Sequence, residues 1–210
     1  MKTYAVITGD IINFTKLTPV NRQLLIEDSA KLLKGWIKKS ADAEIYRGDS
    51  FQVLFEDITE ALNRSIQLLC WFKLRSDQIN NINIGTRISI GIGEVSYRGK
   101  NVLSSDGEAF HLSGRNFDQM KNGELLAIIT PDQEKNAAIE VILNFVNKII
   151  RDWSFAQAEV IYLLVEGKTQ QEIANELSLT QPSVNSRIKL ANWKDVELAL
   201  KYISELAQRK

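Results

Sequence analysis

The stretch that decides the fold is Gly167–Trp193, which reads GKTQQEIANELSLTQPSVNSRIKLANW. Gly167 follows a segment with helical spacing over about residues 154–166, and glycine readily adopts the conformation found just beyond a helix end. Thr169 and Glu172 then stand three residues apart, so that each side chain can bond the backbone N–H of the other in a capping box. These signals predict that one helix ends at Gly167 and that the next begins at Thr169.

A second start signal follows after a few residues. Thr180 is placed to cap a further helix, and Pro182 falls in its first turn, where proline is tolerated. Ala174 is small, which allows the two helices to cross closely. The inner faces are predicted to hold Ile173, Leu177, Leu179, Val184 and Ile188. The pattern as a whole predicts a helix-turn-helix.

The outer side of the last of these helices carries side chains suited to reading DNA. Amide and guanidinium groups match base edges, whereas hydroxyl groups and lysine match phosphates. Between Thr180 and Asn192 there are two basic residues and no acidic one. The predicted contacts with double-stranded DNA are Thr180, Gln181, Ser183, Asn185, Ser186, Arg187 and Lys189. The alternative is a bundle of three helices that contacts another protein.

The charge balance counts against tight DNA binding by a monomer. The chain has 26 basic and 26 acidic residues, and residues 151–210 hold eight of each. DNA-binding domains usually carry a basic excess. An apolar stripe after Ala191, predicted to be a packing or dimer helix, consists of Val196, Leu200, Ile203 and Leu206.

Composition indicates an ordinary globular protein, with 44% hydrophobic and 25% charged residues. No segment approaches the roughly 18 unbroken apolar residues of a membrane span, and the N-terminus has no signal-peptide pattern, so a cytoplasmic protein with no membrane partner is expected. Cys70 lies in an apolar run and is predicted to be a core residue. With one cysteine and one histidine, a zinc site is almost excluded.

The first 150 residues alternate between strand and helix patterns. Strands are predicted at Thr3–Gly9, 44–47, 50–55, Thr86–Val95 and Leu125–Thr130, and helices at about 19–39, 59–76, 108–121 and 131–150. This order predicts an α+β fold, an open sheet with helices on one face, over residues 1–150. A small all-α domain over residues 151–210 follows.

Two features of this first domain bear on function. In Thr86–Val95, Ser89, Gly91 and Gly93 share one face of the strand, which predicts that another element packs unusually close to it. Asp10 and Asp49 each follow a glycine, the first at the end of a strand and the second in a two-residue Gly-Asp hairpin turn. On adjacent strands, two such carboxylates can hold Mg²⁺, although Gly-Asp is also ordinary turn chemistry.

Four segments resemble class III nucleotidyl cyclases, whose open sheet is ferredoxin-like. TGDIINFT resembles their metal-binding strand end, IYRGDSFQVLF their hairpin, RISIGIGEV their glycine-rich strand, and GEAFHLSGR their helix with an Asn-x-x-x-Arg motif. The segment Gly167–Trp193 resembles the helix-turn-helix of LuxR-type regulators and of sigma factor region four, except that Ser178 stands where a glycine is common. The combination resembles the SatD family of bacterial proteins.

The cyclase resemblance implies roles for particular residues. Asp10 and Asp49 match the aspartates that bind Mg²⁺ or Mn²⁺, and Arg115 matches the arginine that contacts the nucleoside triphosphate. His111 stands in place of the asparagine that orients the ribose, and Ile45 in place of the lysine that selects the purine. A second, distal lysine has no counterpart. Loss of such a charge contact typically costs about a hundredfold in rate, so the resemblance implies metal and nucleotide binding more than turnover.

Two functions of different classes follow. The first is a transcription regulator, a homodimer in which the cyclase-like domain senses a nucleotide or metal, or only dimerises, while the helix-turn-helix binds DNA. The second is an enzyme, a metal-dependent nucleotidyl cyclase or nucleotidyltransferase that is regulated by its C-terminal module. A scaffold in which both sites are vestigial is a third alternative.

Overall fold

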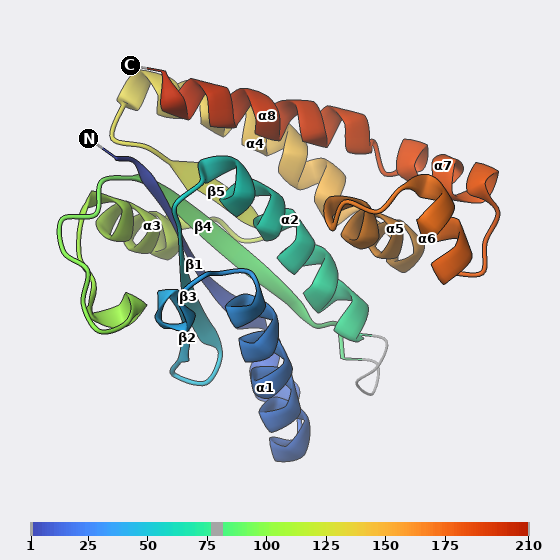
Figure 1. The fold of residues 1–210 in the computed structure, drawn as a ribbon, viewed down its shortest axis with the longest axis horizontal. Coiled ribbons are helices and arrows are strands. Elements are labelled where there is room, and N and C mark those ends of the chain that lie inside the picture. The colour runs from blue at the N-terminus through green and yellow to red at the C-terminus, as the bar shows by residue number, and fades with distance from the viewer. Residues whose placement is uncertain (1, 77–81, 210) are drawn as a thin grey trace.

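The computed structural model describes residues 2–76 and 82–209, and in these ranges it combines a five-stranded sheet with eight α-helices (Figure 1). The strands are β1 Tyr4–Ile12, β2 Ala43–Tyr46, β3 Ser50–Phe55, β4 Gly85–Gly93 and β5 Leu126–Ile129. The helices are α1 Pro19–Gly35, α2 Ile58–Arg75, α3 Glu108–Gln119, α4 Gln133–Arg151, α5 Phe155–Val165, α6 Gln170–Glu176, α7 Gln181–Leu190 and α8 Trp193–Gln208. Within the described ranges, no helix has the length and apolarity needed to cross a membrane.

The sheet is mixed, with the strand order β2-β3-β1-β4-β5. The pairs β2-β3, β3-β1 and β1-β4 are antiparallel, whereas β4 and β5 run parallel. The central strand β1 therefore has a partner along both edges, and Asp10 stands opposite Ser50 of β3 and Arg87 of β4. The mixed α+β class predicted from the sequence is confirmed at this level.

Helices cover both faces of the sheet, in contrast to the single covered face that was predicted. Ile7 and Ile90 belong to the core that α2 completes on one face. On the other face, Val6 packs with Ala109 and Phe110 of α3. The sequence order of strands and helices does not specify the face on which each helix packs, which explains the error.

The close approach predicted for the glycine face of β4 is confirmed. A Cβ atom added to Gly91 would lie 2.2 Å from the carbonyl oxygen of Ala109 and 2.4 Å from the backbone nitrogen of Ser113. Ser113 also shares a hydrogen bond with Thr8 of β1, with 2.9 Å between the two hydroxyl oxygens. Helix α3 therefore lies directly on the backbone of β4, which is possible only because the strand has no side chain at Gly91.

The C-terminal helices pack onto the rest of the chain. Helix α5 contacts α2, and α8 contacts both α2 and α4, so one hydrophobic core runs from the sheet into the last helix (Figure 1). Val196, Leu200 and Ile203 are buried in this contact. The amine of Lys135 at the start of α4 donates to the carbonyl oxygen of Arg209 at 2.6 Å, so α4 and α8 run antiparallel.

Two predicted turns differ in the structure. Strand β1 continues to Ile12, so Asp10 lies within the strand and not in a loop after it. The hairpin loop has three residues, Arg47–Asp49, because Tyr46 pairs with Ser50. The positive φ angles fall on Arg47 and Gly48, at 54° and 89°. Pairing with both neighbours holds β1 extended past its glycine, an effect that local sequence does not reveal.

Candidate functional site

Helices α6 and α7 begin at the caps that the sequence predicts. The Thr169 side chain accepts from the backbone N–H of Glu172, and the Glu172 carboxylate accepts from that of Thr169, which completes the capping box. Thr180 caps α7 by accepting from the backbone N–H of Ser183. Between them, Ser178 has a φ of 53°, the left-handed conformation in which glycine is common. Both helices therefore begin at the caps that the sequence predicts.

One side of α7 is packed against its neighbours. Val184 and Ile188 are buried, as are Ile173 and Ala174 of α6. The main contacts of α7 are with α5, α6 and α8. The sheet does not cover the opposite side of the helix, which lies at one end of the molecule (Figure 1).

The exposed side of α7 carries most, but not all, of the predicted DNA contacts. The exposed members are Thr180, Gln181, Ser183, Ser186 and Lys189. Asn185 and Arg187 are half-buried, although both were expected on the exposed side. The guanidinium of Arg187 lies 3.5 Å from the carboxylate of Glu159 on α5, so its charge is partly balanced within the chain. Arg187 must leave this ion pair to reach a phosphate or a base.

Charges near α6 and α7 are largely paired. The amine of Lys168 contacts the carboxylates of Glu166 and Glu176, and the hydrogen bond that it donates to Glu176 raises the pKa of Lys168. The hydrogen bonds from Thr169 lower the pKa of Glu172 and keep its carboxylate ionised at the start of α6. Lys189 is exposed and forms no ion pair with any residue that the structure describes, whereas Arg187 of the same helix is paired with Glu159.

Asp10 lies within β1, and Asp49 ends the hairpin loop that leads into the neighbouring strand β3. The backbone N–H of Ile11 donates to the carbonyl oxygen of Asp49 at 3.0 Å, which fixes the hairpin loop beside β1. The carboxylate of Asp10, however, already has a partner. The Arg87 guanidinium donates to both of its oxygens, at 3.0 and 2.9 Å.

The surroundings of Asp10 contain a cation of the chain itself and two aromatic rings. The hydrogen bond to Asp10 raises the pKa of Arg87, and the Arg87 guanidinium also lies over the Phe117 ring, 4.6 Å from its centroid. Burial raises the pKa of the Tyr46 phenol nearby, the charge of Arg47 opposes this shift, and the negative field of Asp118, Asp10 and Asp49 adds to it. In the described part of the chain, no three Asp, Glu, His or Cys side chains converge as metal ligands. Arg87 thus supplies the positive charge that a metal would bring to Asp10.

The predicted catalytic candidates His111 and Arg115 lie on the exposed side of α3. The imidazole of His111 is 2.7 Å from the carboxylate of Asp106, in the loop before the helix. The opposite side of α3 contacts the sheet through Ser113 and through Asn116, which donates to the Ser89 hydroxyl at 3.0 Å. Among the described residues, no hydrogen bond or ion pair connects His111 or Arg115 to Asp10 or Asp49.

Two residues that bond to these sites, Arg87 and Trp153, were not predicted from the sequence. Arg87 alternates with the buried Ile88 and Ile90 along β4, so its outward position could have been predicted, but its pairing with Asp10 depends on strand register. The Trp153 indole N–H donates to the carbonyl oxygen of Ala191, the residue that caps the C-terminal end of α7, at 2.7 Å. Because Trp153 and Ala191 are 38 positions apart, no local sequence pattern predicts this hydrogen bond.

Comparison with known protein families finds no match for this chain, and comparison with curated proteins finds none either. Function is therefore inferred from the geometry described above. The exposed face of α7 and the paired Asp10 are the two observations that separate the candidate functions.

Proposed function

We propose that this protein is a DNA-binding regulator of the SatD type, in which α6 and α7 form a helix-turn-helix and α7 enters the major groove. The observation that carries the proposal is the division of α7 into two sides. Val184 and Ile188 are buried, whereas Gln181, Ser183 and Ser186 face solvent. Polar side chains near the start of a helix are the groups that reach base edges in such complexes.

The sheet domain supports the same assignment. The order β2-β3-β1-β4, with every pair antiparallel, is the arrangement expected for a ferredoxin-like, cyclase-like sheet. Because Arg87 occupies both carboxylate oxygens of Asp10, this geometry favours a dimerising or sensing role over nucleotidyl transfer. The enzyme alternative requires release of pyrophosphate from a nucleoside triphosphate with Mn²⁺, and we expect none.

Binding to a short fluorescent duplex of mixed sequence, measured by anisotropy over a range of salt concentrations, tests the proposal. The wild-type chain should bind more weakly as salt rises, because each phosphate contact releases condensed cations. Lys189→Gln should lower the affinity and reduce the slope of log K against log salt by about 1, the value expected for one lost phosphate contact.

Lys201→Gln is the matched control, because Lys201 is also an exposed lysine but lies on α8. It makes the same change of charge and should leave the slope unchanged. Equal effects of the two substitutions would mean that any binding is a general charge effect. Absence of salt-dependent binding by the wild-type chain would exclude the proposed function.

A further inference from the structure

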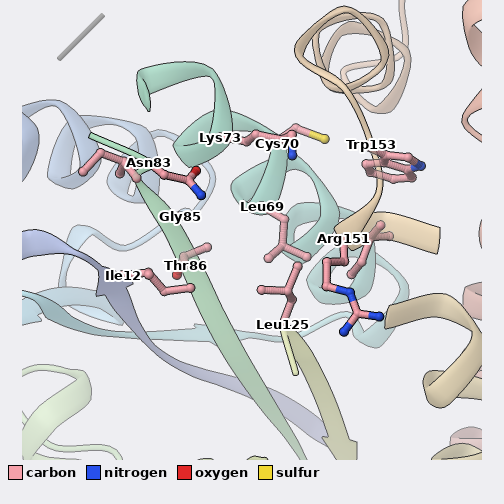
Figure 2. Close-up of a pocket in the computed structure, with 12 residues that line it drawn as sticks. Ile12, Leu69, Cys70, Lys73, Asn83, Gly85, Thr86, Leu125, Arg151 and Trp153 are labelled. Carbon is pink, nitrogen blue, oxygen red and sulfur yellow. The ribbon is translucent and has the colours of Figure 1, made fainter. Parts of the chain in front are cut away.

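A cavity of about 160 Å³ lies where the sheet, α2 and the junction of α4 with α5 meet (Figure 2). One water molecule needs only about 10–15 Å³ of such space, so the cavity can hold a small organic molecule. Its apolar lining is contributed by Ile12, Leu69, Cys70, Ile84, Leu125, Ile150 and Trp153. Its polar lining is contributed by Lys73, Asn83, Thr86 and Arg151.

The described polar residues around the cavity are cationic or neutral. Lys73 of α2 and Arg151 at the end of α4 both line it, and none of the described lining residues is acidic. Figure 2 shows Lys73 near Asn83, with Arg151 beside Leu125. Burial lowers the pKa of Lys73, and the field of Asp152 opposes this shift only in part. In the described ranges, neither cation forms an ion pair, so an anion entering the cavity would meet two positive charges, of which that of Lys73 is balanced only in part by Asp152.

One wall of the cavity is connected to the end of α7. The Trp153 side chain is buried and lines the cavity, and its indole N–H donates to the carbonyl oxygen of Ala191 at 2.7 Å. Its ring centroid lies 6.4 Å from that of Trp193, the first residue of α8. A molecule that displaces Trp153 would therefore change the position of the residues that end α7 and begin α8.

We propose that this cavity binds a small organic anion, a carboxylate attached to an apolar ring, and that its occupancy alters DNA binding through Trp153. The carboxylate meets Lys73, with Arg151 adding positive charge on another wall, and the ring lies against Leu69, Leu125 and Trp153. Ligand sites of this kind combine mainly apolar walls with a few placed polar groups. The regulatory half of the proposal rests on the proposed function, whereas the binding half does not.

Isothermal titration of the full-length protein with benzoate, and with benzamide as its neutral counterpart, tests the binding half. Benzoate should bind saturably, and benzamide at least roughly tenfold more weakly, because it lacks the charge. Lys73→Gln should weaken benzoate binding at least roughly tenfold, and Arg151→Gln should weaken it as well. Lys148→Gln, an exposed lysine one turn before Arg151 in α4, should leave it unchanged.

Three outcomes would overturn the binding half: no saturable binding of benzoate, equal binding of benzamide, or an equal loss in Lys148→Gln. Near-ultraviolet circular dichroism of each variant checks that it is folded. The regulatory half is measured separately, as the change in DNA affinity on adding benzoate. Trp153→Phe retains an aromatic ring but loses the bond to Ala191, so it should still bind benzoate while its DNA affinity no longer responds.

The proposed function and the proposed ligand site can be excluded independently of each other. If the wild-type chain does not bind DNA, the proposed function is wrong, but the calorimetric result for benzoate still stands. If benzoate binds and the DNA affinity of the wild-type chain does not respond, the connection through Trp153 is wrong and the site itself remains.

Discussion

At the scale of single residues, Ser178 has a backbone conformation that is unfavourable for a residue with a side chain. Its φ of 53° places it in the left-handed region, which costs a residue with a Cβ roughly 1–2 kcal/mol relative to glycine. Ser178→Gly should therefore raise the free energy of unfolding by about 0.5–1 kcal/mol, since the greater freedom of glycine in the unfolded chain offsets part of the gain. Urea denaturation measures this change.

Ser178→Ala is the control, because alanine keeps the Cβ and should give no gain. Equal stability of the glycine and alanine variants would show that the left-handed turn is not the source of strain. Sequence reasoning identified Ser178 as the departure from the usual turn, and the backbone conformation explains why a glycine is common there.

The ion pair between Arg187 and Glu159 supports a second prediction at this scale. Both side chains are partly exposed, so the pair contributes only about 0–1 kcal/mol to stability. Glu159→Gln should leave the fold intact, free Arg187 and remove a negative charge beside α7. We expect DNA affinity to rise roughly three- to tenfold, equivalent to about 1 kcal/mol.

Fluorescence anisotropy with the same duplex measures this change. Glu205→Gln removes one charge from the exposed surface of α8 and is the matched control, with no expected effect. The double variant Glu159→Gln/Arg187→Gln should lose the gain. A gain that persists in the double variant would mean that Arg187 does not contact DNA.

At the scale of elements, helix caps and glycines allowed helix starts and close contacts to be predicted from the sequence. Contacts that depend on the register of paired strands could not be predicted in this way. The capping box at Thr169 and the cap at Thr180 act within a few residues, so the starts of α6 and α7 were predicted correctly. The pairing of Asp10 with Arg87 joins residues 77 positions apart, and no local pattern encodes it. The candidate site on α7 was therefore largely predictable, whereas the state of Asp10 was not.

The contact of α3 with β4 gives a prediction for a pair of elements. Gly91→Ala places a Cβ against backbone atoms of α3, which cannot move independently of the helix, so we expect a loss of about 3 kcal/mol. Gly114→Ala is the control within α3 itself, because nothing lies within 4 Å of its added Cβ. In a helix interior it should increase stability by roughly 0.5–1 kcal/mol.

Urea denaturation of both variants separates steric contact from a general effect of glycine replacement. A Gly91→Ala variant as stable as the wild-type protein would mean that α3 does not rest on β4 as closely as described. Destabilisation by Gly114→Ala would mean instead that α3 is sensitive to any substitution along its length.

At the scale of the whole molecule, the outer side of α4 and α8 is a candidate surface for a second copy of the chain. Val141 and Phe145 of α4 and Leu198 and Tyr202 of α8 are exposed, Phe145 to 68%. Because Lys135 meets Arg209 at the ends of these antiparallel helices, the four side chains lie at matching levels along them. A two-fold interface is formed by the same surface patch of both copies. The exposed apolar side chains of α4 and α8 can form such a patch.

Phe145→Glu should convert a dimer into a monomer, because the interface would then bury an unpaired charge from each copy. Sedimentation equilibrium measures the mass, with Val20→Glu as the control, since Val20 is also 68% exposed but lies on α1. Two recognition helices bind half-sites about one DNA turn apart, so the Phe145→Glu monomer should also lose affinity for a palindromic duplex. A wild-type chain that sediments as a monomer, or a Phe145→Glu variant that remains a dimer, would exclude this surface. In either case, DNA binding by residues 151–210, which carry no basic excess, would need contacts other than those of a second recognition helix.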